Sequence, residues 1–416
     1  MKVLWSVNTI IPDIAKKMGL RSGHAISWVD AMRTAFKCIP ETVTLAIVCH
    51  GGFRVSKLTK FEDEGVTYYI LPHSCERFDF WKEILNEFEP DVIHIYGTER
   101  KHNLILIRKY KSEYPIIISL QGIISEYARH YYAMIPLGEI LRNYTIHDLV
   151  FRNGIIAGKN SFIRQSKIEN EMFHEVDFVE GRSDWDKATV KNLNPKVHYY
   201  YCPRMLRSPF YNYKWKAEAY IEHTILVSQG DYPIKGLHFM IEALAILKEK
   251  YPDIKLIVAG KDIFQSKWYM EKGYTKIIKN KIKKYSLENA IEFTGYINAE
   301  QMAERLSNVN VCVVPSAIEN APNSLAEAMI VGTPCVASYV GGNADMLNNG
   351  ECGLLYCYYE PQMLAERIEE LFDNREKCLR LSETASQVAR KRHDPNVLPK
   401  QLINIYKEAI EEFIGK

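Results

Sequence analysis

The hydrophobic positions of this chain fall into two kinds of segment that alternate along its length. Short apolar runs predict buried strands, and longer segments with apolar residues every three or four positions predict helices. In the first half the runs are 2–7, 43–48, 66–71, 92–96 and 115–120, with helical segments such as 25–36 and 80–88 between them. Such alternation is typical of a parallel, doubly wound sheet with helices on both faces.

The second half repeats this pattern. Strands are predicted at 224–227, 255–259, 291–296, 311–314 and 334–340, and helices at 361–372, 376–391 and 397–414. Between the halves, the segment 198–215 is rich in aromatic residues and lacks clean periodicity, which fits an interdomain connection. Because 416 residues are too many for one ordinary core, we expect an α/β protein with two domains, residues 1–207 and 208–396.

The stretch 311–355 joins a buried strand, a loop and a helix. Pro322 suits the first turn of that helix, where its missing N–H is no loss, and Gly332 ends the helix. Asn323 and Ser324 also lie in the first turn, where free backbone N–H groups and the helix dipole favour an anion. The sequence therefore predicts a phosphate or diphosphate site at the start of this helix.

Two acidic residues flank the predicted phosphate site. Glu327 shares a helix face with Asn323 and Ser324, and Glu319 lies in the preceding loop, outside the carboxyl end of the strand. Open α/β sheets bind ligands at that edge. Two carboxylates on either side of a diphosphate suggest hydroxyl recognition, with a sugar near Glu319 and a ribose near Glu327. The alternative is an ordinary amphipathic helix with two solvated acids.

The segment PSAIENAPNSLAEAMIVGTPCVAS, with a GG pair after it, resembles the E-x7-E signature of retaining GT-B glycosyltransferases of family 4. The resemblance is close in the C-terminal half and loose in the N-terminal half. It implies two Rossmann-like, doubly wound parallel-sheet domains facing across a cleft, with the last helix, 397–416, joined to the first domain. It also implies that Glu319 contacts the donor sugar, that Glu327 contacts the ribose, and that Asn320 belongs to the donor site.

The same resemblance implies further donor-binding residues. Lys235 and Gly236 precede a predicted helix, where a lysine can neutralise phosphate charge. The family usually pairs this lysine with an arginine five residues earlier, and this chain has Gly230 there. The loop 16–24 stands where the family has a glycine-rich turn near the donor diphosphate, which suggests Gly23. An ordinary surface loop is the alternative for that segment.

In the first half, the segment PDVIHIYGTE ends a predicted strand with polar residues at the carboxyl edge of the sheet. Related enzymes place a residue near the reacting sugar here, often a histidine. We take His94 and Glu99 as candidates for the catalytic group of this domain. His94 alternates into the strand, so it fits a satisfied core histidine equally well.

Composition and charge narrow the function. Apolar residues make up 47% and charged residues 25% of the chain, which fits a globular protein, and the net charge of +2 gives no argument for nucleic acid. The nine cysteines are scattered without a CxxC pair, which indicates a reducing compartment. No His or Cys grouping has ligand spacing, and the family resemblance implies metal independence, so we expect no metal and no cofactor. The first 14 residues resemble a strand and not a signal peptide, and no stretch is long enough to span a bilayer, so a cytoplasmic location is expected.

The segment 135–173 is helical and mixes apolar with basic residues, including Arg142, Arg152 and Lys159. One interpretation is peripheral contact with an anionic membrane or a lipid-linked acceptor at the inner face of the plasma membrane. The solvated face of ordinary helices is the alternative, and the sequence favours it. The nearby segment FVEGRSDWD resembles one found in bacterial members of family 4.

The resemblance to family 4, together with these observations, implies a retaining glycosyltransferase. It would move a sugar from a nucleotide-diphosphate sugar to a saccharide or lipid-linked saccharide acceptor, in surface polysaccharide biosynthesis. Two alternatives stay open: a non-catalytic nucleotide-sugar-binding protein of the same fold, and a sugar-nucleotide 2-epimerase. Sugar transfer to an acceptor identifies the transferase, turnover without a transferred product identifies the epimerase, and binding without turnover identifies the non-catalytic protein.

Overall fold

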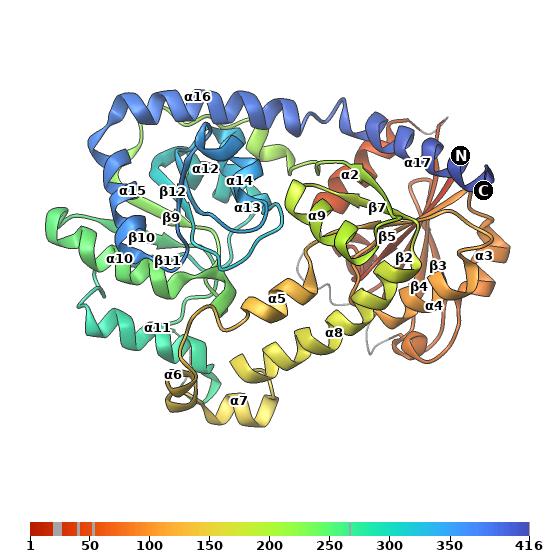
Figure 1. Ribbon diagram of the computed structural model, residues 1–416, viewed down its shortest axis with the longest axis horizontal. Helices are drawn as coiled ribbons and strands as arrows, with labels where there is room; N and C mark the ends of the chain where they lie inside the picture. The colour runs from red at the N-terminus through yellow and green to blue at the C-terminus, as the bar shows by residue number, and fades with distance from the viewer. Residues whose placement is uncertain (20–26, 40–41, 52–54, 266–267, 416) are drawn as a thin grey trace. The chain divides into compact units, whose positions relative to one another are not determined.

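The computed structural model describes residues 1–19, 27–39, 42–51, 55–265 and 268–415 (Figure 1). The chain divides into two compact units. Unit 1 comprises residues 1–125, 164–206 and 393–416, and unit 2 comprises 126–163 and 207–392. Residues 126–163, which lie inside the predicted first domain, therefore pack with unit 2.

Unit 1 is built on an eight-stranded sheet in the order β3-β4-β2-β1-β5-β6-β7-β8. Its strands are β1 (Lys2–Val7), β2 (Thr44–His50), β3 (Thr59–Asp63), β4 (Val66–Leu71), β5 (Val92–Tyr96), β6 (Ile116–Ser119), β7 (Phe178–Gly181) and β8 (His198–Tyr201). β3 runs antiparallel to β4 at one edge, which differs from the predicted all-parallel sheet. Glu64 and Gly65 join these two strands with φ of 48° and 78°, the conformation of a tight hairpin turn.

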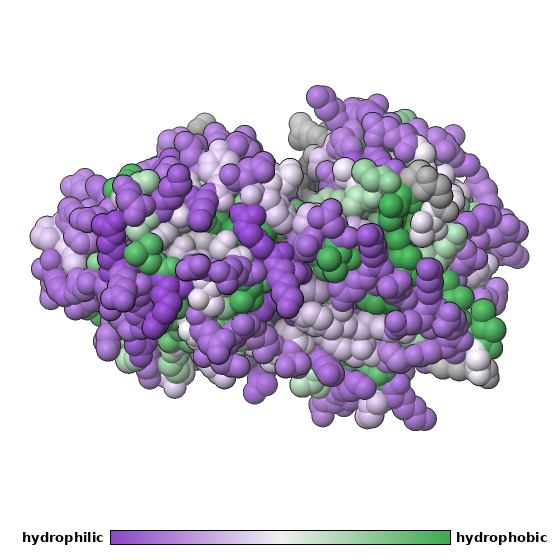
Figure 2. Space-filling model, turned by 90° about the horizontal axis from the view of Figure 1, so that it is seen from above, coloured by the Kyte–Doolittle hydropathy of each residue, from purple (hydrophilic) through white to green (hydrophobic). Residues whose placement is uncertain are grey.

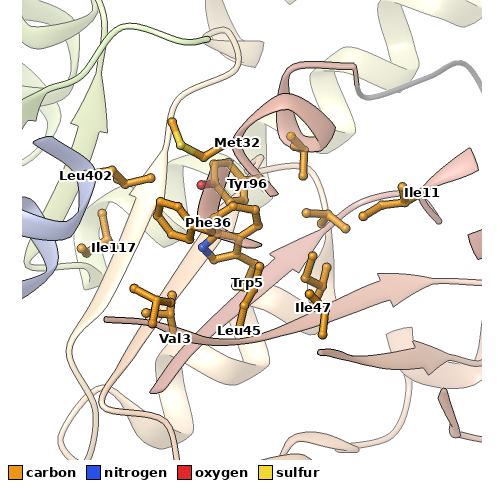
Figure 3. Packing of buried hydrophobic residues seen from close by; sticks show 14 of the residues in the cluster. Val3, Trp5, Ile11, Met32, Phe36, Leu45, Ile47, Tyr96, Ile117 and Leu402 are labelled. Carbon is orange, nitrogen blue, oxygen red and sulfur yellow. The ribbon is translucent and has the colours of Figure 1, made fainter. Parts of the chain in front are cut away.

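Helices cover both faces of this sheet (Figure 1). They are α1 (Pro12–Lys17), α2 (Ser27–Lys37), α3 (Trp81–Phe88), α4 (Lys101–Tyr110), α9 (Asp184–Leu193), α17 (Leu398–Ile414) and the unit 1 part of α8 (Ile155–Glu175). On one face Trp5 packs against Phe36 and Tyr96, with ring centroids 5.4 Å and 5.3 Å away (Figure 3). These rings belong to a buried cluster that also includes residues of α17, so both ends of the chain contribute to one core.

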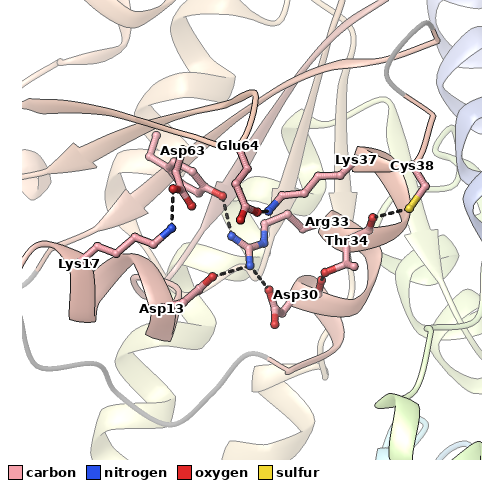
Figure 4. Close-up of polar contacts among 10 residues, drawn as sticks. Asp13, Lys17, Asp30, Arg33, Thr34, Lys37, Cys38, Asp63 and Glu64 are labelled. Atoms are coloured by element: carbon pink, nitrogen blue, oxygen red, sulfur yellow. Dashed lines mark hydrogen bonds and ion pairs between the residues drawn. The ribbon is translucent and has the colours of Figure 1, made fainter.

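A buried arginine ties the first helices to the sheet. Arg33 on α2 donates from Nη2 to Asp13 Oδ2 of α1 at 2.7 Å and from Nη1 to the Tyr68 hydroxyl of β4 at 2.7 Å (Figure 4). It also pairs with Asp30. Because a buried guanidinium is stable only when its donors are satisfied, these contacts fix how α1 and α2 approach the sheet.

Unit 2 contains a second, six-stranded parallel sheet in the order β11-β10-β9-β12-β13-β14. Its strands are β9 (Ile221–Val227), β10 (Lys255–Val258), β11 (Ile291–Phe293), β12 (Val309–Val314), β13 (Cys335–Ser338) and β14 (Leu354–Tyr356). Its main helices are α10 (Leu237–Lys250), α11 (Gly273–Lys284), α12 (Ala299–Asn308), α13 (Asn323–Val331), α15 (Pro361–Asp373) and α16 (Arg375–Arg392), with the short helices α6 (Leu137–Arg142), α7 (Ile146–Phe151) and α14 (Asn343–Met346). α5 (Ile124–His130) and α8 each have residues in both units.

The segment 198–215 and the possibility of a membrane-spanning helix are both subjects of sequence predictions. The segment 198–215, predicted as an irregular connection, begins with the strand β8, whose four residues pair in parallel with β7. Within the described residues, no helix combines the length and apolarity that crossing a bilayer requires.

Candidate functional site

The sheet of unit 2 has a topological switch point between β9 and β12. From β9 the chain proceeds outward to β10 and β11, and from β12 it proceeds outward in the other direction to β13 and β14. Ligands of open α/β sheets bind outside the carboxyl ends of the strands at such a point. The loop after β9 carries Lys235 and the loop after β12 carries Glu319. The topology therefore brings these two predicted site residues to the same edge.

Lys235 and Glu319 form a short ion pair at this edge. Lys235 Nζ donates to Glu319 Oε1 at 2.6 Å, and the Ser316 hydroxyl donates to the same oxygen at 2.8 Å. The Glu319 residue is 5% exposed. Burial by itself lowers the pKa of Lys235. The Glu319 carboxylate and the Tyr232 hydroxyl oxygen more than offset this effect, so the pKa of the ammonium is raised overall. Lys235 is therefore positively charged at neutral pH.

Two glycines hold the backbone around Glu319. Gly236 has φ of +70°, and a Cβ on it would lie 1.7 Å from the Pro315 carbonyl oxygen. Gly341 has φ of +50°, and a Cβ there would lie 1.7 Å from the carbonyl oxygen of Glu319 itself. The N–H of Gly342 donates to that same carbonyl oxygen at 3.1 Å. Only glycine fits these approaches, so the predicted donor residue Gly236 has a structural role that the sequence did not reveal.

α13 begins directly after this loop. Its first helical residue is Asn323, and Pro322 occupies the N-cap position, so the prediction of Pro322 within the first turn was wrong by one residue. No side chain caps the helix. Asn323 and Ser324 are half-buried in the first turn, and Asn320 is buried in the preceding loop. The first N–H groups of α13 are thus oriented toward the edge where Lys235 and Glu319 meet.

Glu327 is bound by an arginine that the sequence did not suggest. Arg207 Nε donates to Glu327 Oε1 at 2.9 Å, and Arg207 Nη2 donates to Oε2 at 2.9 Å. Such a fork-to-fork pair fixes the plane of the carboxylate. Arg207 lies in the irregular segment before β9, 120 residues earlier in the chain. No local pattern marks it, so only tertiary packing identifies it.

The protonation of Glu327 depends on this pair. Burial raises the pKa of Glu327 to about 7, and the attraction and hydrogen bonds of Arg207 partly oppose that rise. Desolvation disfavours the charged carboxylate, while the guanidinium favours it. Glu327 therefore titrates near neutral pH.

His94, a candidate catalytic residue, lies in the interior of unit 1. His94 is 0% exposed. Its Nδ1 lies 2.7 Å from the Tyr406 hydroxyl oxygen, and its Nε2 lies 3.6 Å from Glu180 Oε2. Burial lowers the pKa of His94, and the charge of Glu180 acts against this shift. His94 is therefore a buried histidine whose Nε2 has no hydrogen-bond partner among the described residues, and its catalytic role stays a prediction.

Glu99 lies at the switch point of the other sheet, between β1 and β5. Its Oε1 accepts from Asn8 Nδ2 at 2.5 Å, and Gly97, with φ of +103°, leaves room for this contact. Burial raises the pKa of Glu99, and its hydrogen bonds lower it to a smaller extent. Asn8 is a further polar residue of this edge that sequence reasoning missed.

Two remaining predictions concern Gly23 and metals. Gly23 lies outside the described residues.

Among the described residues, His50, Cys75 and Glu76 place ligand-type atoms within 4.8 Å of one another, a grouping that no local sequence pattern indicates. Glu76 Oε2 also accepts a hydrogen bond of 3.0 Å from the backbone N–H of Lys101, at the start of α4. The expectation of a metal-independent protein stays a prediction.

Residues 214–388 match the family model described as glycosyl transferases group 1, a range that contains Lys235, Glu319 and Glu327. Over these residues the chain is similar to the group 1 glycosyltransferases.

One relative and two solved structures illustrate these likenesses. An uncharacterized glycosyltransferase of Bacillus subtilis, YqgM, is 26% identical over 195 residues, which are 47% of this chain and 52% of the relative. The chain spans about half the length of this and several other curated relatives. Sucrose-phosphate synthase from Thermosynechococcus elongatus superposes with a TM-score of 0.71 at 14% identity and covers 99% of this chain and 100% of that one. Anabaena HepE, solved with UDP and glucose, superposes with a TM-score of 0.66 at 17% identity, over 98% of this chain and 100% of that one. These likenesses establish the GT-B fold expected for the whole chain.

Proposed function

We propose that this protein transfers a sugar from a nucleoside-diphosphate sugar to a saccharide or lipid-linked saccharide acceptor. The observation that carries the proposal is the Lys235–Glu319 pair beside the start of α13, at the switch point of the unit 2 sheet. The family match over residues 214–388 supports it, and a structural neighbour holds UDP and glucose.

In this proposal the donor diphosphate binds the N–H groups at the start of α13 and the ammonium of Lys235. Charge develops on the leaving diphosphate as the glycosidic bond breaks, so a fixed cation and a helix N-terminus stabilise the transition state. Glu319 holds the lysine in place. A carboxylate has about four acceptor positions, and Lys235 and Ser316 use only part of them, so Glu319 can also accept from donor sugar hydroxyls.

Glu327 would accept from the ribose hydroxyls, with Arg207 fixing its orientation. Retention of the anomeric configuration and a role in surface polysaccharide assembly belong to the same proposal, and both rest on the E-x7-E and GRSDWD resemblances. A cytoplasmic location belongs to it too, and is supported by nine cysteines that are all free thiols.

The first experiment is thermal unfolding of the purified chain with a panel of UDP-, GDP- and ADP-sugars. A ligand at about 100 times its Kd stabilises the folded state by about 2.7 kcal/mol, so one nucleotide class should raise the Tm. Glu319→Gln and Lys235→Met should lose this ligand-induced shift. Glu351→Gln, an exposed acid of the same unit, should keep it. If no nucleotide sugar stabilises the wild type, the proposal fails.

A non-catalytic nucleotide-sugar-binding protein is the second candidate, and two observations favour it. Gly230 stands where the family carries an arginine, and His94 is buried against Tyr406 and Glu180. Such a protein would show the thermal shift without releasing nucleoside diphosphate when acceptors are added. Measuring that release with saccharide and lipid-linked acceptors separates the two candidates.

A further inference from the structure

The short helices α6 and α7 in unit 2 expose an unusual amount of apolar side chain. They lie at the edge of this unit, next to α11 and the turn at 268–270 (Figure 1). Six large residues on them are between 53% and 66% exposed. We call this set the α6–α7 apolar face, and its residues are Leu137, Leu141, Ile146, Leu149, Val150 and Phe151.

The spacing of these residues is that of a stripe a globular protein normally buries. Leu137 and Leu141 are four apart on α6, and Ile146, Leu149 and Val150 follow the i, i+3, i+4 pattern on α7. Amphipathic helices of soluble domains turn such a stripe toward the core. By contrast, the face of the molecule on the α16 side is mainly hydrophilic, with apolar residues in scattered groups (Figure 2).

The polar side of α7 is the side that packs inward. Thr145 and Asp148 form a capping box at its start, and Asp148 is 1% exposed. Asp148 Oδ2 accepts from the N–H of Gly273 at 2.8 Å, and the Thr145 hydroxyl donates to the Glu271 carbonyl oxygen at 2.8 Å. A Cβ on Gly273 would lie 2.6 Å from Asp148 Oδ2, so the glycine permits this approach. The helix is thus fixed with its apolar residues toward solvent.

Basic side chains accompany the apolar face. Arg142 at the end of α6 and Arg152 after α7 are exposed. α11, which contacts α6, carries five lysines and no acid between residues 273 and 284, and two of these lysines, Lys279 and Lys281, are paired with Glu271 and Glu242. Apolar residues flanked by cations suit an anionic lipid surface. In a symmetric contact with a second copy, both surfaces would contribute the same basic residues, so they would not be complementary in charge.

We propose that the α6–α7 apolar face inserts into the interface of an anionic lipid bilayer, with Arg142 and Arg152 on the headgroups. This deepens the proposed function, because it places unit 2 at the surface where a lipid-linked acceptor resides. The sequence alone favoured ordinary solvated helices for this segment, and the inward-facing Thr145 and Asp148 reverse that preference.

The test is flotation of the purified full chain with vesicles of phosphatidylcholine alone or with 30% phosphatidylglycerol added. We expect binding to the anionic vesicles that weakens as salt increases. Leu149→Ser combined with Phe151→Ser should lower the partition at least about tenfold, because two exposed apolar side chains no longer insert. Arg142→Gln with Arg152→Gln should weaken binding to anionic vesicles only. Ile414→Ser, which replaces an apolar residue 78% exposed on α17, is the matched control and should bind as the wild type does.

Two results would overturn the proposal. One is a wild type that does not float with anionic vesicles, or a Leu149→Ser/Phe151→Ser variant that floats equally well. The other is a dimer in analytical ultracentrifugation that this variant abolishes, which would make the face a self-association surface. Nucleotide-induced thermal stabilisation, measured without lipid, should be the same in the variants and the wild type. Failure of vesicle binding with that stabilisation intact therefore rejects only this inference, whereas vesicle binding without any nucleotide effect rejects the proposed function.

Discussion

At the scale of single residues, each of the two predicted donor carboxylates is buried beside one cation. Glu319 contacts Lys235, and Glu327 contacts Arg207. Taking a carboxylate out of water is costly unless a partner compensates for the lost hydration. Each pair therefore behaves as one unit, and removing the cation affects the acid as well.

Arg207 gives the first prediction at this scale. Arg207→Ala should destabilise the protein by about 2–4 kcal/mol, because Glu327 would be left buried without its partner. Arg207→Lys should recover part of that loss, since it keeps the charge but not the two parallel hydrogen bonds. Arg305→Ala breaks an exposed pair with Glu292 and should cost less than about 1 kcal/mol. Denaturant unfolding measures all three, and equal losses for Arg207 and Arg305 would contradict the prediction.

The pKa of Glu327, about 7 in the folded protein against 4.5 ordinarily, gives the second prediction. Between these values the folded state binds more protons than the unfolded state, so stability falls as pH rises. The loss begins above pH 4.5 and is complete above about pH 7. Wild type should lose roughly 3 kcal/mol across this window relative to Glu327→Gln, which does not titrate.

Unfolding at several pH values checks this slope. Glu169, buried in unit 1 with its pKa also raised to about 7, titrates in the same window. The comparison with Glu327→Gln removes its contribution, because Glu169 is present in both proteins. A difference between the two proteins that does not change with pH would show that Glu327 is already ionised at pH 5.

At the scale of elements, the site depends on two backbone contacts. The turn before α10 meets the end of β12 at Gly236, and the turn after β13 meets the loop of Glu319 at Gly341. In both places a carbonyl oxygen occupies the space of a Cβ. Main-chain contacts at two glycines therefore help to position the loops of the site, together with the side-chain bonds of Glu319.

Replacing these glycines tests that statement. Gly236→Ala and Gly341→Ala should each destabilise by about 2 kcal/mol or more, because a methyl group meets rigid backbone and φ is positive. Both should also reduce nucleotide stabilisation. Gly138→Ala on α6 is the control, since its Cβ would meet nothing within 4 Å, and it should be neutral or slightly stabilising. Thermal unfolding that ranks Gly138→Ala with the other two would refute the argument.

At the scale of the whole molecule, the last helix completes the core of unit 1. Tyr406 on α17 accepts from Trp5 Nε1 at 2.9 Å and lies 2.7 Å from His94 Nδ1. Leu398, Leu402 and Tyr406 all belong to the buried cluster around Trp5. Residues about 400 positions apart thus share one hydrophobic core, and unit 1 is assembled from three separate stretches of chain.

Tyr406→Phe should cost about 1–3 kcal/mol, because a buried indole N–H loses its acceptor. A chain ending at residue 392 should fail to give a folded unit 1, since the cluster around Trp5 would be exposed. Tyr359→Phe, at a residue 56% exposed, should leave stability unchanged. Chemical denaturation and near-ultraviolet circular dichroism measure these effects, and a stable truncated chain would contradict this account of the core.

The sequence by itself determined most of the regular structure. Strands β1, β4 and β5 begin and end where the apolar runs do, because buried parallel strands have few polar residues and their ends are marked by polar residues or turns. It also determined the edge at which Lys235, Glu319 and the start of α13 meet, since a βα pattern orders the strand ends. The Lys235–Glu319 distance was not predictable, but the shared edge was.

Tertiary structure alone decided which partners the site residues have. Arg207 binds Glu327, which is 120 residues later in the chain, and Gly341 packs against the backbone of Glu319. Tyr406 brings α17 into contact with His94. It also decided that α7 faces outward, because Asp148 caps its own helix and bonds to Gly273 of another. Local periodicity reports that a stripe is apolar, but only contacts between distant segments decide which side of a helix the protein buries.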